Sequence, residues 1–184
     1  MIATASQEVA ASAGWGKNGQ VEISAKTEYA VRAMLQLADA AEAAIAVGAA
    51  GTGEVGPTSV DALAEAQGLP RRFLEAILAD LRRAGLVVST KGARGGYHLG
   101  RPATDIPIGA IFRAVDGPLA EVRGRRPQDV TYDGVARHLP VLWVAVRSSL
   151  RQVLDGTSLE QLRTGEIPDA VRALADVPDA WQNR

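Results

Sequence analysis

Apolar and polar residues repeat with the period of an α-helix in the first patterned stretch of the chain. Within residues 25–41 the apolar side chains that share one helical face are Tyr29, Ala30, Ala33, Met34, Leu37 and Ala41. Ser24 precedes them and can accept a hydrogen bond from a backbone N–H of the first turn. The pattern therefore predicts a helix that begins after Ser24.

The segments on either side of this helix have no such period. Residues 1–22 are small and polar, with glycines around Trp15, which predicts a disordered N-terminal tail. Residues 42–57 are rich in alanine and glycine and end in Pro57. This composition suits a flexible insertion better than a packed element.

Two short helical stripes and a pair of strand-like runs come next. Thr58 stands as a cap before the first stripe, and Pro70 opens the second, which ends at Gly85. The second stripe consists of Phe73, Leu74, Ile77, Leu78 and Leu81. Residues 86–90 and 97–101, separated by Lys-Gly-Ala-Arg-Gly-Gly, then predict a β-hairpin.

The C-terminal half contains the longest apolar stripe. A short helix is expected over residues 108–115, followed by an irregular polar stretch over residues 118–133. Beyond it, apolar residues fall at steps of four and three, a heptad rhythm formed by Leu139, Trp143, Val146, Leu150 and Val153. Thr157 and Glu160 form a capping-box candidate for a last short helix, and the C-terminal tail, residues 166–184, is expected to be a loosely attached helix and tail.

Composition agrees with a mainly helical protein. The chain has 184 residues, of which 47% are hydrophobic but only 4% aromatic. It has no cysteine, which excludes disulfides, thiol nucleophiles, zinc fingers and thiolate-bound iron–sulfur clusters. No segment approaches the roughly 20 apolar residues of a membrane helix, and the start lacks the layout of a signal peptide. We therefore expect a cytoplasmic protein with no membrane contact.

The order helix, glycine turn, helix and hairpin is that of a winged helix-turn-helix domain, whose second helix enters the major groove of DNA. Residues 70–101 hold seven basic and only two acidic side chains, although the whole chain has a net charge of -1. Positive charge is thus concentrated where a DNA-binding surface would lie. The sequence predicts a mainly α fold with a small β-hairpin: a winged helix-turn-helix domain followed by a long C-terminal dimerisation helix.

The predicted recognition helix, residues 71–84, has a polar face opposite its apolar stripe. That face holds Arg72, two alanines and Arg83, with Glu75 at its edge. Arg72 can bind guanine through two hydrogen bonds and Glu75 can accept one from cytosine, each worth about 1–3 kcal/mol of discrimination. Arg83 and Lys91 are better placed for phosphates, which add affinity without sequence preference. A solvated charged face is the alternative that the same residues leave open.

The glycine-rich stretch 91–96 does not have the context of a nucleotide-binding loop. Such a loop leads into a helix, whereas this one is followed by a strand-like run and a proline. As a wing it would lie over a minor groove, with Arg94 entering the groove and Lys91 on a phosphate. Gly95 and Gly96 would form the turn.

These motifs resemble a known family, the winged-helix repressors that include the iron–sulfur cluster regulator, the nitric-oxide-sensing repressor and the cysteine-metabolism repressor. The resemblance covers residues 23–35, 63–102 and 142–162, and its most specific part is the frame FLE...L..L...GLV.S..G..GGY.L..P. It implies a homodimeric transcriptional regulator that binds a two-fold symmetric operator in double-stranded DNA. We expect it to act as a repressor.

Matching the family's motifs onto this chain implies which residues contact DNA. Bases are contacted from the positions of Pro70, Arg72 and Glu75. The first helix approaches phosphates with Lys26 and Tyr29. The predicted surface also includes Thr58, Ser59 and Arg71.

The stripe around Trp143 corresponds to the family's dimerisation helix, although its pattern alone suits an intramolecular core equally well. Many family members carry three cysteines ahead of this helix to hold an iron–sulfur cluster, and this chain has none. Asp129, Asp133 and His138 are the candidate metal ligands there, and such scattered residues are more often solvated. We expect no cofactor. The effector, a small molecule, a partner protein or neither, is left open.

Two other functions compete with DNA binding. One is a protein-interaction module that has lost DNA binding and keeps only the dimerisation helix. The other is a nucleotide-binding enzyme, for which His98 and His138 lack catalytic partners at usable spacing. The expected division of the chain is a tail at 1–22, a DNA-binding domain at 23–117, a linker loop with dimerisation helices at 118–165, and a tail at 166–184.

Overall fold

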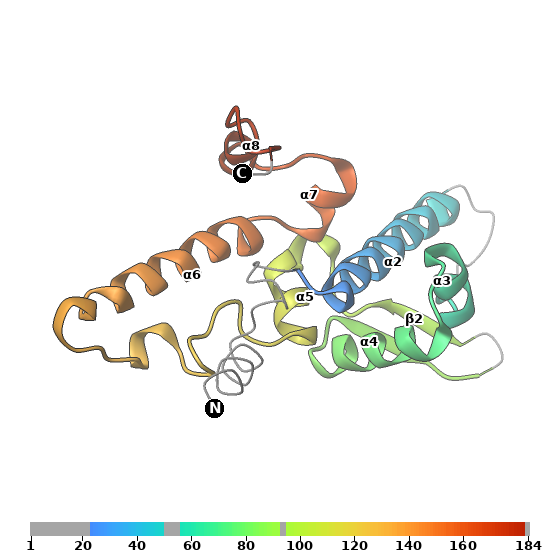
Figure 1. The fold of residues 1–184 in the computed structure, drawn as a ribbon. Helices are drawn as coiled ribbons and strands as arrows, with labels where there is room; N and C mark the ends of the chain where they lie inside the picture. The colour runs from blue at the N-terminus through green and yellow to red at the C-terminus, as the bar shows by residue number, and fades with distance from the viewer. Residues whose placement is uncertain (1–22, 50–55, 93–94, 183–184) are drawn as a thin grey trace.

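Helix α2 is the longest element, and α3, α4, α5, α7 and β2 all contact it (Figure 1). The computed structural model describes residues 23–49, 56–92 and 95–182. In chain order the helices and strands are α2 (Ala25–Ala49), α3 (Val60–Gln67), α4 (Arg71–Arg83), β1 (Val87–Thr90), β2 (Gly96–Leu99), α5 (Ile108–Val115), α6 (Leu139–Asp155), α7 (Leu159–Thr164) and α8 (Asp169–Ala175). Three short 3-10 turns are η1 (Ala103–Asp105), η2 (Pro127–Asp129) and η3 (Gly134–Ala136). The predicted mainly helical fold with one hairpin is confirmed.

Ser24 caps α2, as its position predicts. Its Oγ accepts a hydrogen bond from the backbone N–H of Thr27 at 3.0 Å. Thr27 is fully buried, and its hydroxyl donates to Asp116 at 2.6 Å. Ser24 donates to the same carboxylate. These bonds join the beginning of α2 to the end of α5.

The end of α2 lies farther along the chain than the sequence pattern indicates. The helix extends to Ala49, so the first part of the predicted flexible insertion, 42–57, is helical. Alanine has the highest helix propensity, and the run Glu-Ala-Ala-Ile-Ala-Val contains no breaker. Residues 50–55 and the predicted tail at 1–22 lie outside the described residues.

Helices α3 and α4 form the helix-turn-helix. The hydroxyl of Ser59 accepts a hydrogen bond from the Ala62 backbone N–H at 3.1 Å, so Ser59 is the N-cap of α3. The predicted cap, Thr58, is therefore wrong. Gly68 ends α3 in the left-handed conformation, with φ of 64°. Pro70 then stands directly before α4.

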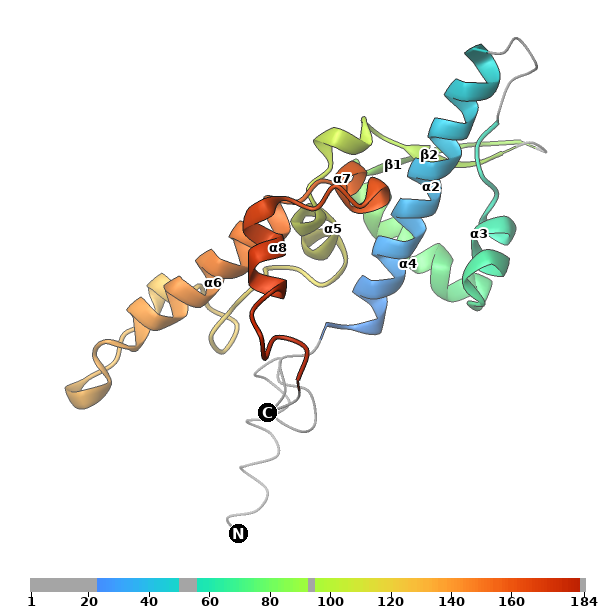
Figure 2. The ribbon, with the colours of Figure 1, turned by 90° about the horizontal axis from the view of Figure 1, so that it is seen from above.

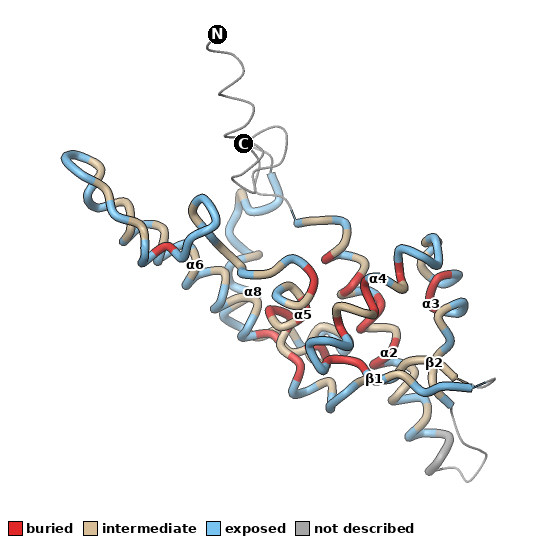
Figure 3. Tube along the Cα trace, turned by 90° about the horizontal axis from the view of Figure 1, so that it is seen from below, coloured by how far each residue is buried: buried red, intermediate tan, exposed pale blue. Residues whose placement is uncertain are grey.

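The hydrophobic core lies mainly between α2, α4 and α5 (Figure 3). Its largest fully buried side chains are Met34, Leu37, Leu63, Leu74, Ile77, Leu78, Leu81, Leu86, Ile106, Ile111, Leu159 and Val87. Four of the five predicted stripe residues of α4 belong to it. Phe73, the fifth, is 38% exposed because it lies in the first turn of α4, where its ring meets the edge of Tyr29.

Strands β1 and β2 form an antiparallel hairpin in which Thr90 lies opposite Gly96. The backbone of Thr58 pairs with that of Tyr97. The Thr58 N–H donates to the Tyr97 carbonyl at 3.0 Å, and the Tyr97 N–H donates to the Thr58 carbonyl at 2.8 Å. The segment that leads into α3 is therefore attached to β2 like a short third strand.

Helix α6 projects from the rest of the structure (Figures 1 and 2). None of its 17 residues is buried. The turn η2 contacts α6, and Pro127 is buried there. In the part of the chain that the structure describes, no helix is long and apolar enough to cross a membrane.

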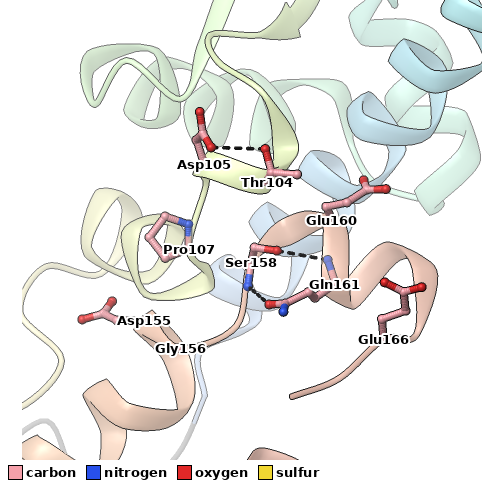
Figure 4. Close-up of a pocket in the computed structure, with 9 residues that line it drawn as sticks. All are labelled: Thr104, Asp105, Pro107, Asp155, Gly156, Ser158, Glu160, Gln161 and Glu166. Carbon is pink, nitrogen blue, oxygen red and sulfur yellow. Dashed lines mark hydrogen bonds between the residues drawn. The ribbon is translucent and has the colours of Figure 1, made fainter. Parts of the chain in front are cut away.

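A capping box begins α7, one residue later than predicted (Figure 4). The Ser158 hydroxyl accepts from the Gln161 backbone N–H at 3.1 Å, and the Gln161 side chain accepts from the Ser158 N–H at 2.9 Å. The predicted pair, Thr157 with Glu160, is therefore wrong. Thr157 is buried instead, and its hydroxyl donates to the Val153 carbonyl at 2.9 Å.

Candidate nucleic-acid interface

The outer face of α4 is exposed, whereas its inner face is fully buried. Leu74, Ile77 and Leu78 have no exposed surface. Arg72 and Ala76 lie on the outer side and are exposed. Arg72 makes no hydrogen bond or ion pair with any residue that the structure describes. A free guanidinium beside a small side chain allows close approach to an acceptor such as a base edge.

Arg71 joins α3 to α4 through two carboxylates. Its Nη1 donates to Asp61 at 2.8 Å, and its Nε donates to Glu75 at 2.8 Å. The hydrogen bond to Glu75, together with the charge of Asp61, raises the pKa of Arg71. Glu75 must therefore leave Arg71 before it can accept a hydrogen bond from a base.

Lys26 lies at the junction of α2, α4 and α5. Its ammonium donates to the Val115 carbonyl at 2.8 Å and pairs with Asp80 at 2.6 Å. Asp80 also pairs with Arg83. The hydrogen bond from Lys26 holds the pKa of Asp80 below its usual value, and the nearby cations act in the same direction. Two of the predicted phosphate contacts, Lys26 and Arg83, are thus held by one carboxylate of α4.

Tyr29 links α2 to the beginning of α4. Its ring lies edge-on to Phe73, with the ring centroids 5.8 Å apart. The guanidinium of Arg32 lies over the same ring at 5.6 Å. Arg32, which is not among the predicted contacts, is exposed on the side of α2 that carries Tyr29. Its position three residues after Tyr29 was the available signal.

Three other predicted DNA contacts lie directly before the two helices of the helix-turn-helix: Thr58 and Ser59 before α3, and Pro70 before α4. Thr58 is held through its backbone by Tyr97. The Ser59 hydroxyl accepts the capping hydrogen bond of α3 and still has a hydrogen to donate. Pro70 is exposed at the start of α4. These residues share the end of the helix pair from which Arg72 emerges.

Exposed basic side chains flank the hairpin. Lys91 lies near its tip and Arg101 follows β2, and neither pairs with an acidic side chain within the described ranges. Arg82 donates to the Ser89 hydroxyl at 3.3 Å, which fixes α4 to β1. Arg94 lies outside the described residues. Lys91 and Arg101 are therefore the cations with the greatest freedom to bind phosphate near the wing.

The glycines of the wing have different roles from those predicted. A Cβ on Gly95 would lie 2.4 Å from the Thr90 carbonyl oxygen, and one on Gly96 would lie 2.4 Å from that of Thr58. Both positions therefore need glycine for close packing. The Gly95 N–H donates to the Gly92 carbonyl at 2.9 Å, so Gly95 does belong to the turn, but the positive φ, 117°, lies at Gly92 and not at Gly95 or Gly96.

The predicted dimerisation residues lie on α6, outside the core. Four of them are half-buried: Leu139, Trp143, Leu150 and Val153. Val146 is 45% exposed, and the indole N–H of Trp143 is buried without a hydrogen-bond partner. Three exposed neighbours fell outside the heptad pattern: Val141, Leu142 and Val144. The apolar surface of α6 is therefore larger than predicted, and the residues that the structure describes leave much of it exposed.

A depression of about 530 Å³ lies where η1, α6 and α7 meet (Figure 4). Its acidic lining residues are Asp105, Asp155, Glu160 and Glu166. Asp155 accepts from Arg113 at 2.8 Å, and Glu160 accepts from Arg163 at 2.6 Å. The hydrogen bond from Arg163 lowers the pKa of Glu160. Half of these carboxylates are thus engaged in ion pairs: Asp155 joins α6 to α5, and Glu160 pairs within α7.

Comparison with known proteins identifies relatives over most of the chain. Residues 23–165 match the Rrf2 family, described as an iron-dependent transcriptional regulator. The chain is 44% identical over 156 residues to a putative HTH-type transcriptional regulator of Mycobacterium tuberculosis. The aligned region covers 85% of this chain and 89% of that protein. It is similar to the structure of CymR, the global cysteine regulator of B. subtilis. The TM-score is 0.61 and the identity 33%, covering 79% of this chain and 98% of that chain.

The structure of IscR from T. potens is also similar, with a TM-score of 0.57 and 33% identity, covering 84% of this chain and 93% of that chain. These similarities confirm the predicted winged-helix fold. The iron in the family's description finds no matching ligands here. The sequence has no cysteine, and no group of three or more His, Cys, Asp or Glu side chains that could hold a metal occurs in the described ranges. Asp129, Asp133 and His138 lie within those ranges. The residues present do not fit a thiolate-bound cluster.

Proposed function

The chain belongs to the Rrf2 family of transcriptional regulators, and we propose that it acts in the cytoplasm as a homodimer that binds a two-fold symmetric operator and represses transcription. A member of this family is a regulator and not an enzyme, so the alternative of a nucleotide-binding enzyme is wrong. Three surfaces support the proposal: the outer face of α4, the hairpin, and the exposed face of α6.

Base recognition is supported by one observation above all: α4 is buried on one side and exposes an unpaired arginine on the other. A major groove about 12 Å wide admits a single helix of this kind. Arg72 would bind the O6 and N7 atoms of guanine, and Ala76, one turn later, would let the helix approach closely. Arg71 would control whether Glu75 is free to contact the neighbouring base.

Phosphate contacts would come from both ends of the helix and from the hairpin. Lys91 and Arg101 are exposed and have no acidic partner within the described ranges, so they can displace the counterions that surround DNA. Arg83 would have to exchange Asp80 for a phosphate. Arg94 is proposed to enter the minor groove beside the wing.

Dimerisation would occur through α6, whose apolar face is partly exposed among the residues that the structure describes. Two copies related by a two-fold axis would present two α4 helices to successive major grooves, about 34 Å apart. A dimer bound in this way excludes other proteins from the same DNA, which is the physical basis on which we propose repression. The effector stays open between a small molecule, a partner protein and none.

The proposal is tested by selecting DNA from a pool of random duplexes with the full chain. We expect enrichment of a two-fold symmetric sequence. Arg72→Ala should then weaken binding to that sequence by about 1–3 kcal/mol and relax one base position in each half-site. Arg172→Ala, an exposed arginine of α8, is the matched control and should bind like the native chain. Failure to enrich any symmetric sequence, or equal binding by the two variants, would contradict the proposal.

A further inference from the structure

Helix α8 and the residues after it expose apolar side chains that the winged helix does not use. Leu174 is 58% exposed, Val177 45% and Trp181 87%, and no residue of α8 is buried. The indole N–H of Trp181 donates to the Ala175 carbonyl at 2.8 Å, which folds the end of the segment back onto α8. This segment lies beyond the residues that match the family, 23–165.

The apolar side of α8 adjoins the C-terminal half of α6 (Figure 2). A depression of about 340 Å³ lies between them and is lined by Val153, Val171, Leu174, Ala175, Ala180 and Trp181. Val153 belongs to α6 and to the heptad stripe, whereas the other residues belong to α8 and the turn that follows it. The depression is therefore continuous with the face of α6 that we assign to the dimer.

The C-terminal half of helix α6 is attached to the winged helix. Asp155 pairs with Arg113 of α5, and Leu154 packs against the core. The N-terminal half projects outward and exposes Val141 and Leu142 (Figure 1). When two α6 helices pair antiparallel about a two-fold axis, the N-terminal half of each lies on the C-terminal half of the other. This pairing brings the projecting half of one copy to the α8 depression of the other.

The charges of the two segments are complementary. Residues 134–154 contain three arginines and no acidic residue, whereas residues 166–182 contain four acidic residues and one arginine. Arg147 of α6 forms no ion pair among the residues that the structure describes, and neither does the side chain of Asp176, at the end of α8. Opposite charges on facing surfaces favour association and select the partner.

We propose that α8 is a second dimer contact, which packs against the N-terminal half of α6 from a second copy of this chain. Val141 and Leu142 of that copy fill the depression beside Leu174, and symmetry produces the contact twice in each dimer. The inference rests on the proposed dimerisation through α6. It adds the C-terminal segment, which lies beyond the residues that match the family, to the interface.

The test compares two variants of the full chain by sedimentation equilibrium. Leu174→Asp places a charge in the depression, and Ala173→Asp places the same charge on the opposite side of α8. We expect Leu174→Asp to raise the dimer dissociation constant at least about tenfold, because an unpaired carboxylate is buried in the contact. Ala173→Asp should change it by less than about threefold, within the range of exposed substitutions. Circular dichroism checks that both variants keep the helical content of the native chain.

Equal dissociation constants for the two variants would overturn the role of α8 while leaving dimerisation through α6 intact. A native chain that stays monomeric at every concentration would instead overturn the proposed dimer itself. The two failures are therefore distinguishable.

Mixing charge-reversed chains distinguishes a contact between copies from one within a chain. Asp176→Arg and Arg147→Asp each place like charges in the contact, so each variant alone should dimerise more weakly than the native chain at low salt. In a mixture, the heterodimer restores opposite charges on both sides, and association should recover to within about threefold of native. A mixture no stronger than its components would show that α8 pairs with α6 of its own chain, which contradicts the inference.

Discussion

The winged helix and helix α6 both have apolar stripes, but they differ in what covers them. Ile77 of α4 and Ile111 of α5 have no exposed surface, because the two helices pack on α2 and on each other. Val141 of α6 is 72% exposed, and no residue of that helix is buried. Figure 3 shows the contrast as buried residues gathered around α4 and α5 and a largely exposed α6.

The difference shows that an apolar helical stripe can either be buried in the core or lie exposed on the surface. Removing apolar surface from water is worth roughly 25 cal/mol per Å² wherever it occurs. For the winged helix this free energy is released when one chain folds. For α6, the proposed dimer would release it when a second molecule binds, so its contribution would depend on protein concentration.

The largest expected effect is in the core. Leu78→Ala should lower the free energy of unfolding by about 2–5 kcal/mol, because it removes a fully buried side chain and leaves a cavity. Leu142→Ala, on the exposed face of α6, should change it by less than about 1 kcal/mol in dilute solution. Urea denaturation of both variants measures the contrast. Similar losses at the two positions would mean that α6 is covered within its own chain.

The next effect should appear only in association. Val146→Asp should weaken the dimer by about 2–3 kcal/mol, since the interface would bury an unpaired charge. The unfolding of the dilute monomer should hardly change, because Val146 is 45% exposed there. Sedimentation equilibrium and dilute thermal melting give the two quantities. An unaltered dissociation constant would remove α6 from the interface.

A smaller effect separates the DNA-binding side from the dimer side. Lys91→Ala should weaken binding to every DNA sequence by about 1 kcal/mol and reduce the slope of log affinity against log salt by about one. Arg151→Ala, an exposed arginine of α6, should leave that slope unchanged. Fluorescence anisotropy titrations at several salt concentrations test both variants. The assignment of Lys91 to a phosphate fails when the two slopes agree.

The smallest effect concerns the ion pairs inside the winged helix. Asp80→Asn should cost about 1 kcal/mol of stability near neutral pH, because it removes the carboxylate that holds Lys26 and Arg83. The pKa of Asp80 is lowered in the folded chain, so the stabilisation is complete above the unfolded value of about 4 and is lost as the pH falls through the folded value. Denaturation of both chains at pH 7 and pH 3 should show that the native chain exceeds Asp80→Asn in free energy of unfolding by less at pH 3 than at pH 7. A constant advantage would contradict the pairing.

The periodic pattern of apolar residues was sufficient to locate the helices whose apolar faces are buried in the core. The stripe of Leu74, Ile77, Leu78 and Leu81 follows the period of the helix and is buried as predicted. The glycine after α3 also placed its turn correctly, because few other residues adopt its left-handed backbone conformation. In the hairpin the glycines located the turn, but the positive φ lies at Gly92 and not at Gly95 or Gly96.

Helix caps and ion pairs were harder to predict than the helices themselves. Thr58 and Ser59 both suit a cap, and the choice depends on the pairing of Thr58 with Tyr97, 39 positions away in the printed sequence. Lys26 looked like a free cation because no spacing rule connects it with Asp80. Such contacts arise from packing between helices, and a single sequence contains no periodic signal for them.

The backbone pairing of Thr58 with Tyr97 offers a place to attach a reporter. It fastens the polypeptide to β2 immediately before α3, so a change of length upstream is not passed on to the orientation of α4. A short tag inserted between Ala49 and Gly56 is expected to leave operator affinity unchanged. A fluorophore carried there would follow operator binding in real time without altering the recognition helix or the dimer contact.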